Sequence, residues 1–159
     1  MRIVFMGTPD FAVPSLTALA AKHEVVQVVT RPDAIRGRGK IAEPSAVKIA
    51  AHDLGLPVIE TACMTSDSIE KIIACAPDIL VVVAFGCIIP DELLSSVPLG
   101  GINVHASLLP RLRGAAPIQR AILAGDTLTG VSIMRVVHEL DAGAWCRQSS
   151  CEIGTKTTA

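Results

Sequence analysis

The chain has 159 residues, half of them hydrophobic, and a net charge of −1 at pH 7. This length suits one domain with a substantial core, and the near-zero charge means that any nucleic-acid contact must come from a local basic patch. The apolar runs, Ile79–Ala84 among them, are far too short to cross a bilayer. Five cysteines without a CxxC pair argue against a disulfide framework or a zinc site and for a reducing compartment.

The first half of the chain alternates short apolar runs with segments of helical periodicity. We expect strands at Arg2–Met6, Glu24–Thr30, Leu56–Ile59 and Ile79–Ala84. We expect helices at Phe11–Ala21, Pro44–Leu54, Ser66–Ala76 and, as a single turn, Pro90–Leu94, with Ser66 as the N-cap of the third. A first strand at residue 2 leaves no room for a signal peptide, so we expect a cytoplasmic protein without membrane contact.

The second half is expected to contain three more strands and one more helix. The strands are expected at Gly100–His105, Leu128–Val137 and Trp145–Ile153, and the helix at Ile118–Ala124, with Pro117 in its first turn. Strands that alternate with helices predict an α/β fold, a Rossmann-like, doubly wound and mostly parallel sheet.

Two loops in the first half leave alternatives open. The turn at Gly7–Asp10 is not GxGxxG, so a dinucleotide site loses its main support, and Gly7 either serves strand–helix packing or borders a ligand. The segment Arg31–Lys40 is a basic loop with two glycines and a proline, which we expect to be mobile. It is either a solvated connection or a finger that grips nucleic-acid phosphates.

The stretch GGINVHASLLPRLRGAAP carries the most unusual polar residues of the chain. Asn103 and His105 alternate with Ile102 and Val104, so they lie on one face of a strand. A loop with prolines, glycine and arginines follows at once. An open α/β sheet places its chemistry at the carboxyl ends of strands, so this stretch is a candidate active site. Cys87, after another strand, is interpreted as a small buried thiol and not as a nucleophile.

Several of these motifs together resemble the methionyl-tRNA formyltransferases over essentially the whole chain. They are IVFMGTPDFAVPSL, RGRGK, NVHASLLPRLRGAAPIQ, TGVSIM and LDAG. Of these, NVHASLLP is typical of the wider group of enzymes that use 10-formyltetrahydrofolate, whereas RGRGK and RGAAPIQ are typical of the enzymes that act on tRNA.

The resemblance implies three sets of functional residues. The catalytic set is Asn103, His105 and Asp141. The residues at the folate site are Ser107, Leu108, Leu109 and Pro110, with Phe85 and Gly86. The tRNA-contacting residues are Arg36, Arg38 and Lys40 of the basic loop. The partners would be 10-formyltetrahydrofolate and initiator methionyl-tRNA, with no metal, and the protein is expected to be a monomer.

The residue chemistry fits formyl transfer. When the amino group of methionyl-tRNA attacks the formyl carbon, negative charge develops on the formyl oxygen. Asn103 can donate a neutral hydrogen bond to that oxygen and a protonated His105 a charged one. His105 can also carry a proton toward the leaving folate nitrogen, and Asp141 can favour the charged imidazole or move a proton through water. Ser107 is expected to offer its hydroxyl to a polar edge of the folate.

The chain also departs from the family pattern. Phe85 stands where relatives often have tyrosine, and Ala144–Trp145 stand where another acid is common. Family members continue into a further helix, a linker and a β-barrel domain that helps to grip tRNA. We therefore expect residues 1–159 to be a catalytic domain incomplete at its C-terminal end, with weak stability, poor tRNA affinity and reduced or absent turnover.

Three other functions remain open from the sequence. A formyltransferase that acts on a sugar nucleotide or another small amine would share NVHASLLP without needing the basic loop. A non-catalytic folate-binding remnant would keep the fold without turnover. A dinucleotide-binding oxidoreductase is the weakest, because the glycine fingerprint is missing.

Overall fold

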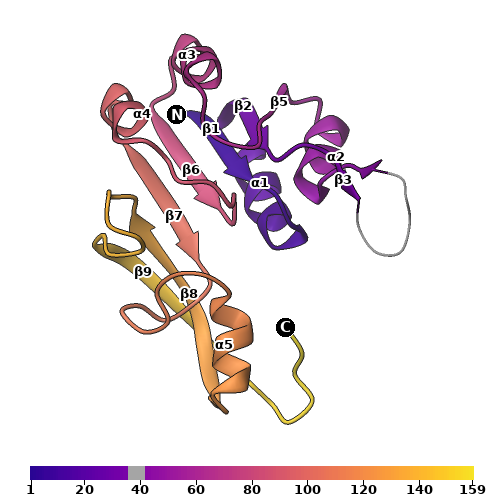
Figure 1. Cartoon of the computed structure of the whole chain (residues 1–159), viewed down its shortest axis with the longest axis vertical. Helices are drawn as coiled ribbons and strands as arrows, with labels where there is room; N and C mark the ends of the chain where they lie inside the picture. The colour runs from indigo at the N-terminus through magenta and orange to yellow at the C-terminus, as the bar shows by residue number, and fades with distance from the viewer. Residues whose placement is uncertain (36–41) are drawn as a thin grey trace. The chain divides into compact units, whose positions relative to one another are not determined.

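The computed structural model describes residues 1–35 and 42–159, which divide into two compact units, Met1–Gly101 and Ile102–Ala159. The first unit contains, in chain order, β1 (Arg2–Gly7), a 3-10 turn (Asp10–Ala12), α1 (Val13–Ala20), β2 (Glu24–Thr30), β3 (Ala34–Ile35), β4 (Ala42–Glu43), α2 (Ala46–Asp53), β5 (Val58–Glu60), α3 (Ser66–Ala74), β6 (Ile79–Val83) and α4 (Asp91–Ser96), as Figure 1 shows. Among the described residues, no helix is both long and apolar enough to span a bilayer.

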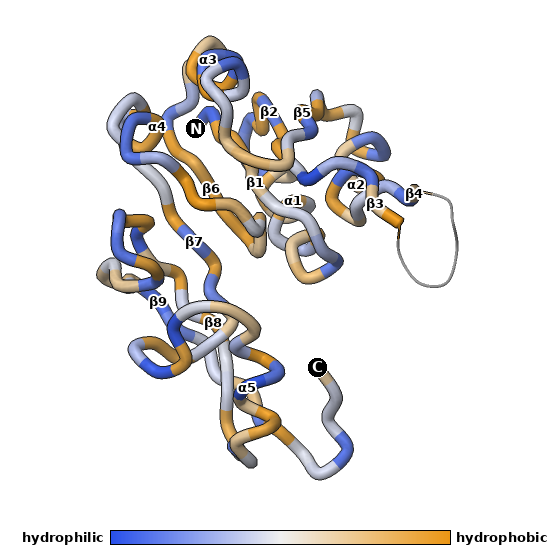
Figure 2. Tube along the Cα trace, in the orientation of Figure 1, coloured by the Kyte–Doolittle hydropathy of each residue, from blue (hydrophilic) through white to orange (hydrophobic). Residues whose placement is uncertain are grey.

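The core of the first unit is a parallel sheet with the strand order β5-β2-β1-β6. Phe5 of β1 lies opposite Val28 of β2 and Val81 of β6. Consecutive residues of β1 after Arg2 and of β6 after Ile79 are buried, and Figure 2 shows the two strands as mostly hydrophobic. Because successive side chains of a strand point to opposite faces, unbroken burial means that both faces of this sheet are covered.

Helices of the first unit begin close to the positions expected from the sequence, but their caps differ in detail. Ser45 precedes α2, and its hydroxyl accepts a hydrogen bond from the Lys48 amide at 3.0 Å. The N-cap of α3 is Thr65, so the expectation that Ser66 would be the cap is wrong. Thr65 and Ser68 satisfy each other's backbone amides in a capping box, an arrangement that Ser66, one position later, cannot reproduce.

The segment after β2 contains more regular structure than a loop. Ala34–Ile35 pairs antiparallel with Ala42–Glu43, and together they form the small β3–β4 sheet. Sequence patterns miss strands of two residues because period-two alternation needs at least four residues to be recognised.

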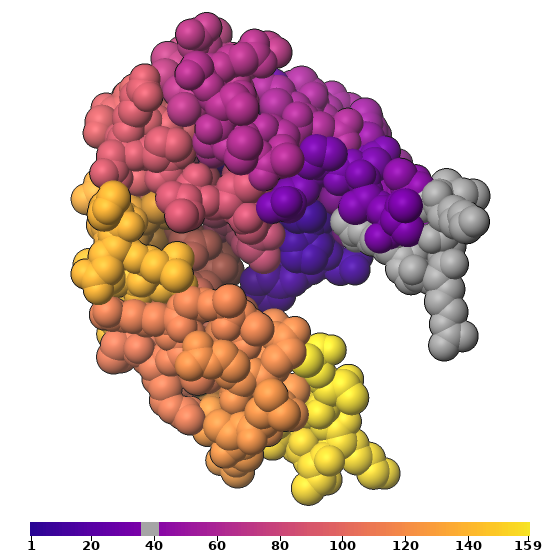
Figure 3. All heavy atoms as spheres, in the orientation of Figure 1, coloured from indigo at the N-terminus to yellow at the C-terminus, as the bar shows by residue number. Residues whose placement is uncertain are grey.

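The second unit contains antiparallel strands and one helix. Its elements are β7 (Gly101–His105, of which Gly101 still belongs to the first unit), α5 (Pro117–Leu123), β8 (Leu128–Arg135) and β9 (Trp145–Glu152). Both β7 with β8 and β8 with β9 pair antiparallel. Beyond β9, residues 154–159 are exposed, and Figure 3 shows them in yellow on the surface.

The architecture confirms the expected fold class. Helices and parallel strands alternate through the first unit, as in a Rossmann-like, doubly wound fold. The strands of the second unit pair antiparallel, so the strand pairing is mostly and not entirely parallel. The hydrophobic pattern predicted the strand positions, but it carries no information on the direction of pairing.

The turn after β1 generates the first testable prediction. A Cβ at Gly7 would lie 2.9 Å from the Ala12 Cβ and 2.9 Å from the Val83 carbonyl oxygen. Because a backbone atom cannot yield as a flexible side chain does, we expect Gly7→Ala to lower the free energy of unfolding by about 1–3 kcal/mol in urea denaturation.

Gly154→Ala is the matched control, because the added methyl group would meet only the Thr157 hydroxyl at 3.7 Å. An unchanged urea midpoint for Gly7→Ala would contradict the close packing described for this turn.

Candidate active site

Asn103 and His105 project from the same face of β7. The two residues are two positions apart on the strand and lie opposite Met134 and Ser132 of β8. His105 is only 6% exposed, an unusual degree of burial for a side chain that can carry charge. Such a histidine needs partners on both ring nitrogens, and the structure supplies them.

Asp141 reaches the same place from the loop between β8 and β9. The loop is closed by a hydrogen bond from the Arg135 amide to the Ala144 carbonyl, 2.9 Å long. Asp141 has a φ of 48°, in the left-handed region that aspartate tolerates better than most residues. Gly143 packs directly against the Arg135 carbonyl, where any side chain would collide with the backbone. The glycine of the LDAG sequence is therefore required by the path of the loop.

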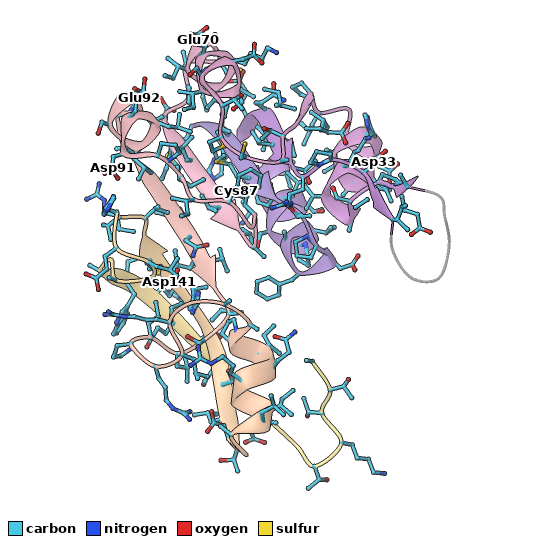
Figure 4. All side chains as sticks on the ribbon, viewed as in Figure 1. Asp33, Glu70, Cys87, Asp91, Glu92 and Asp141 are labelled. Atoms are coloured by element: carbon cyan, nitrogen blue, oxygen red, sulfur yellow. The ribbon has the colours of Figure 1, made fainter. Side chains whose placement is uncertain are left out.

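The side chains of Asn103 and His105 converge on the Asp141 carboxylate. Asp141 is labelled in Figure 4. Oδ1 accepts a hydrogen bond from the Asn103 amide nitrogen at 3.3 Å. Oδ2 lies 3.4 Å from His105 Nδ1 and accepts a hydrogen bond from the Gly114 backbone amide at 2.9 Å. The expected grouping of Asn103, His105 and Asp141 is thus present within the second unit.

The second nitrogen of His105 is held by the turn that follows β7. Nε2 lies 3.0 Å from the Leu112 carbonyl oxygen. Because a carbonyl oxygen can only accept, Nε2 carries a hydrogen in this contact. The other ring nitrogen, Nδ1, faces the Asp141 carboxylate. Both ring nitrogens of His105 therefore have a polar neighbour within the second unit.

The turn at Ser107–Leu112 is stabilised by a buried hydroxyl on β8. Ser132 is fully buried; its hydroxyl donates to the Ser107 carbonyl at 2.6 Å and accepts from the Leu109 amide at 3.0 Å. Gln148 of β9 donates to both the Ser132 hydroxyl and the Leu109 carbonyl. Ser132 therefore holds the segment Ser107–Leu109 at both of its ends.

Ser107 does not offer its hydroxyl to the surface. The residue is 1% exposed, and Oγ donates to the Arg111 carbonyl at 2.7 Å. The turn itself therefore uses the hydrogen of this hydroxyl, and a contact of Ser107 with a ligand stays a prediction. Leu109 is also buried, whereas Leu108 is half-buried and Pro110 is exposed, so these two supply the apolar surface of the turn.

Both arginines of the turn have acidic partners. Arg111 makes a two-pronged salt bridge to Asp126, which lowers the pKa of the Asp126 carboxyl and raises that of the Arg111 guanidinium. Arg113 Nη1 lies 3.7 Å from Glu139 Oε1. A small pocket of about 80 Å³ lies on this turn, lined by Leu108, Arg111, Leu112, Asp126, Leu128 and Thr129.

The remaining expected site residues are not in the second unit. Phe85 and Gly86 follow β6 in the first unit. The Phe85 ring is buried, whereas Gly86 is exposed and has a φ of 80°, and its carbonyl accepts from Arg31 at 3.0 Å. Arg36, Arg38 and Lys40 lie outside the described residues. Within residues 1–35 and 42–159, no group of three or more His, Cys, Asp or Glu side chains is arranged to hold a metal ion.

The whole chain matches one protein family. Residues 1–159 fit the family described as formyl transferase. The chain belongs to this family. It is 52% identical over 160 residues to a methionyl-tRNA formyltransferase of Methylococcus capsulatus, covering 99% of this chain and 52% of that protein. It is 53% identical over 143 residues to one of Leifsonia xyli, covering 90% of this chain and 47% of that protein.

The chain thus spans about half the length of the curated relatives it matches. Solved structures of the same fold are more distant in sequence. A phosphoribosylglycinamide formyltransferase from Anaplasma phagocytophilum superimposes with a TM-score of 0.80 at 20% identity, covering 99% of this chain and 75% of that one. A formyltetrahydrofolate deformylase from Pseudomonas syringae gives a TM-score of 0.74 at 19% identity, covering 99% of this chain and 53% of that one. These likenesses establish the formyltransferase fold.

Sequence reasoning missed the residues that hold the site together. Ser132 is the one polar member of the buried series Gly130, Ser132 and Met134 on β8, which was an available signal. The contacts of Leu112 and Gly114 come from their backbones, so no side-chain pattern could have revealed them.

The Ser132 network generates a stability prediction. Ser132→Ala removes a buried hydroxyl with three hydrogen bonds and leaves the Leu109 amide and the Ser107 carbonyl without this partner. We expect a loss of about 1–3 kcal/mol in the free energy of unfolding, measured by urea denaturation.

Ser149→Ala, an exposed change on the neighbouring strand β9, is the control and should shift the free energy by no more than about 0.5 kcal/mol. Equal effects of the two substitutions would show that Ser132 does not hold the turn.

Proposed function

We propose that the protein transfers the formyl group of 10-formyltetrahydrofolate to the amino group of methionyl-tRNA, acting as a monomer in the cytoplasm. The observation that carries the proposal is the convergence of Asn103 and His105 on the Asp141 carboxylate. Identity of about half to methionyl-tRNA formyltransferases along nearly the whole chain supports the choice of acceptor.

Asn103 is the proposed donor to the formyl oxygen. Its amide nitrogen has two hydrogens, and one of them is used by Asp141 at 3.3 Å. The second hydrogen is available to an oxygen on which negative charge develops. Because Asp141 fixes the orientation of the amide beforehand, this hydrogen bond costs little reorganisation at the moment of reaction.

His105 and Asp141 are the proposed proton-transfer pair. The amino group of the acceptor must lose a proton, and the nitrogen that loses the formyl group must gain one. His105 Nδ1 faces Asp141 Oδ2 at 3.4 Å, so a proton can reside on the ring while the carboxylate stabilises the positive charge. The Gly114 amide keeps the carboxylate in place as the proton moves.

The formyl donor would lie against the turn after β7. The 10-formyltetrahydrofolate molecule supplies an activated formyl group, so this chain has only to position it and balance charge. Leu108 and Pro110 present apolar surface, and the hydrogen bonds of Leu109 to Ser132 and Gln148 keep the turn rigid. The family-based expectation that Phe85 and Gly86 of the first unit contact the folate stays a prediction. Preformed apolar surface with a few polar groups suits a flat heteroaromatic ligand.

The first test of the proposal removes the imidazole. We expect His105→Ala to lower the rate of formylmethionyl-tRNA formation about a hundredfold or more, the scale of losing a general acid–base group. The measurement follows label from 10-formyltetrahydrofolate into charged initiator tRNA.

His52→Ala, an exposed histidine on α2, is the matched control and should keep the parent rate. Near-parent turnover by His105→Ala, in a protein that unfolds at the parent midpoint, would remove His105 from the mechanism.

The second test separates a tRNA acceptor from a small amine. Reversing Arg36, Arg38 and Lys40 to glutamate should abolish most tRNA formylation and flatten its salt dependence, because phosphate neutralisation drives such contacts. Initial rates are compared for charged tRNA and for methionine amide as a small acceptor. Equal losses on both acceptors, or no loss on tRNA, would favour a formyltransferase for small amines.

A further inference from the structure

Two cysteines lie close together on the loops that follow β5 and β6. Cys63 is on the loop after β5, and Cys87 is on the loop after β6. Cys87 Sγ donates a hydrogen bond to the Ala62 carbonyl oxygen at 3.1 Å, and Ala62 is bonded to Cys63. In a trans peptide that oxygen lies about 2.8 Å from the next Cα, so Cys87 Sγ is within about 6 Å of the Cys63 Cα. An S–S bond between them would require the Cys63 side chain to point toward Cys87. Figure 4 labels Cys87 after β6.

The two thiols differ in how readily they meet a solvent oxidant. Cys63 is exposed, whereas Cys87 is half-buried. Burial raises the pKa of the Cys87 thiol, the nearby Arg31 guanidinium opposes this rise, and the charge of a Cys63 thiolate adds to it. Arg31 Nη1 lies 3.7 Å from Cys87 Sγ. Cys63 is therefore the thiol that solvent reaches first, and Cys87 is the one positioned to respond.

We propose that Cys63 and Cys87 form a reversible, peroxide-sensitive disulfide. The Cys63 thiolate attacks one oxygen of hydrogen peroxide; the O–O bond breaks, and the departing hydroxide takes up a proton to leave as water. Cys63 is then a sulfenic acid. Cys87 sulfur attacks the Cys63 sulfur, the S–O bond breaks, and the second hydroxide leaves as water with the proton of Cys87. Two thiols lose two electrons, and one peroxide becomes two waters.

The disulfide would join the loop after β5 to the loop after β6. Both loops follow the carboxyl ends of their strands, which is where open α/β sheets bind ligands. Gly86 is adjacent to Cys87, and its carbonyl is held by Arg31, so the disulfide fixes a segment that is already tethered.

The other cysteines provide internal controls. Cys75 ends α3 and donates to the Lys71 carbonyl of its own helix, and Cys146 and Cys151 lie on β9 in the second unit. The experiment treats the protein with dilute hydrogen peroxide, counts free thiols, and maps linked peptides by mass spectrometry without reductant. We expect the loss of two of the five thiols, one Cys63–Cys87 peptide, and full reversal by dithiothreitol.

Variants decide whether the pair is specific. Cys63→Ser, an exposed change, should leave Cys87 as a free thiol after treatment, whereas Cys151→Ser should still give the linked peptide. The proposal fails if Cys63 proceeds to sulfinic acid without a link, if no thiol reacts, or if Cys63 pairs with Cys151 or Cys146.

Discussion

The carboxylate of Asp141 is the interaction on which the polar centre of the second unit depends. Its two oxygens take hydrogen bonds from the Asn103 amide and the Gly114 backbone, and one of them also faces His105. Three segments thus meet at the Asp141 carboxylate. They are the strand β7, the turn after it, and the loop before β9. A neutral residue could keep some of these bonds, but only a carboxylate can balance a proton that resides on the imidazole.

The surroundings of that charge keep it in one position. Ser132 and Gln148 hold the peptide after His105, and Gly143 allows the Asp141 loop to press against β8. Antiparallel strands supply these contacts directly, because β8 lies between β7 and β9 and faces both. In the second unit, hydrogen bonds from the strands therefore hold the polar side chains in place. In the first unit, by contrast, the sheet is stabilised mainly by burial of Val and Ile on both faces.

The sequence predicted the elements whose signal is hydrophobic burial, and it failed where backbone atoms decide. Continuous apolar runs gave β1 and β6 within a residue or so. The two-residue strands β3 and β4 carry no periodic signal, and the cap of α3 depends on which hydroxyl reaches which amide. Asn103 and His105 were visible as polar residues on an apolar strand, but Asp141 joined them only through family resemblance. The buried role of Ser107 depends on the turn's own carbonyls, which no residue pattern encodes.

The Leu112 carbonyl that holds His105 Nε2 has a further consequence for how a reaction cycle must proceed. In the resting arrangement both ring nitrogens are occupied, one by a peptide and one by an acid. An incoming ligand can use Nε2 only by taking the place of the Leu112 oxygen, so docking competes with an internal bond. A ligand that bonded to Nε2 would therefore have to compensate for the loss of the contact with Leu112.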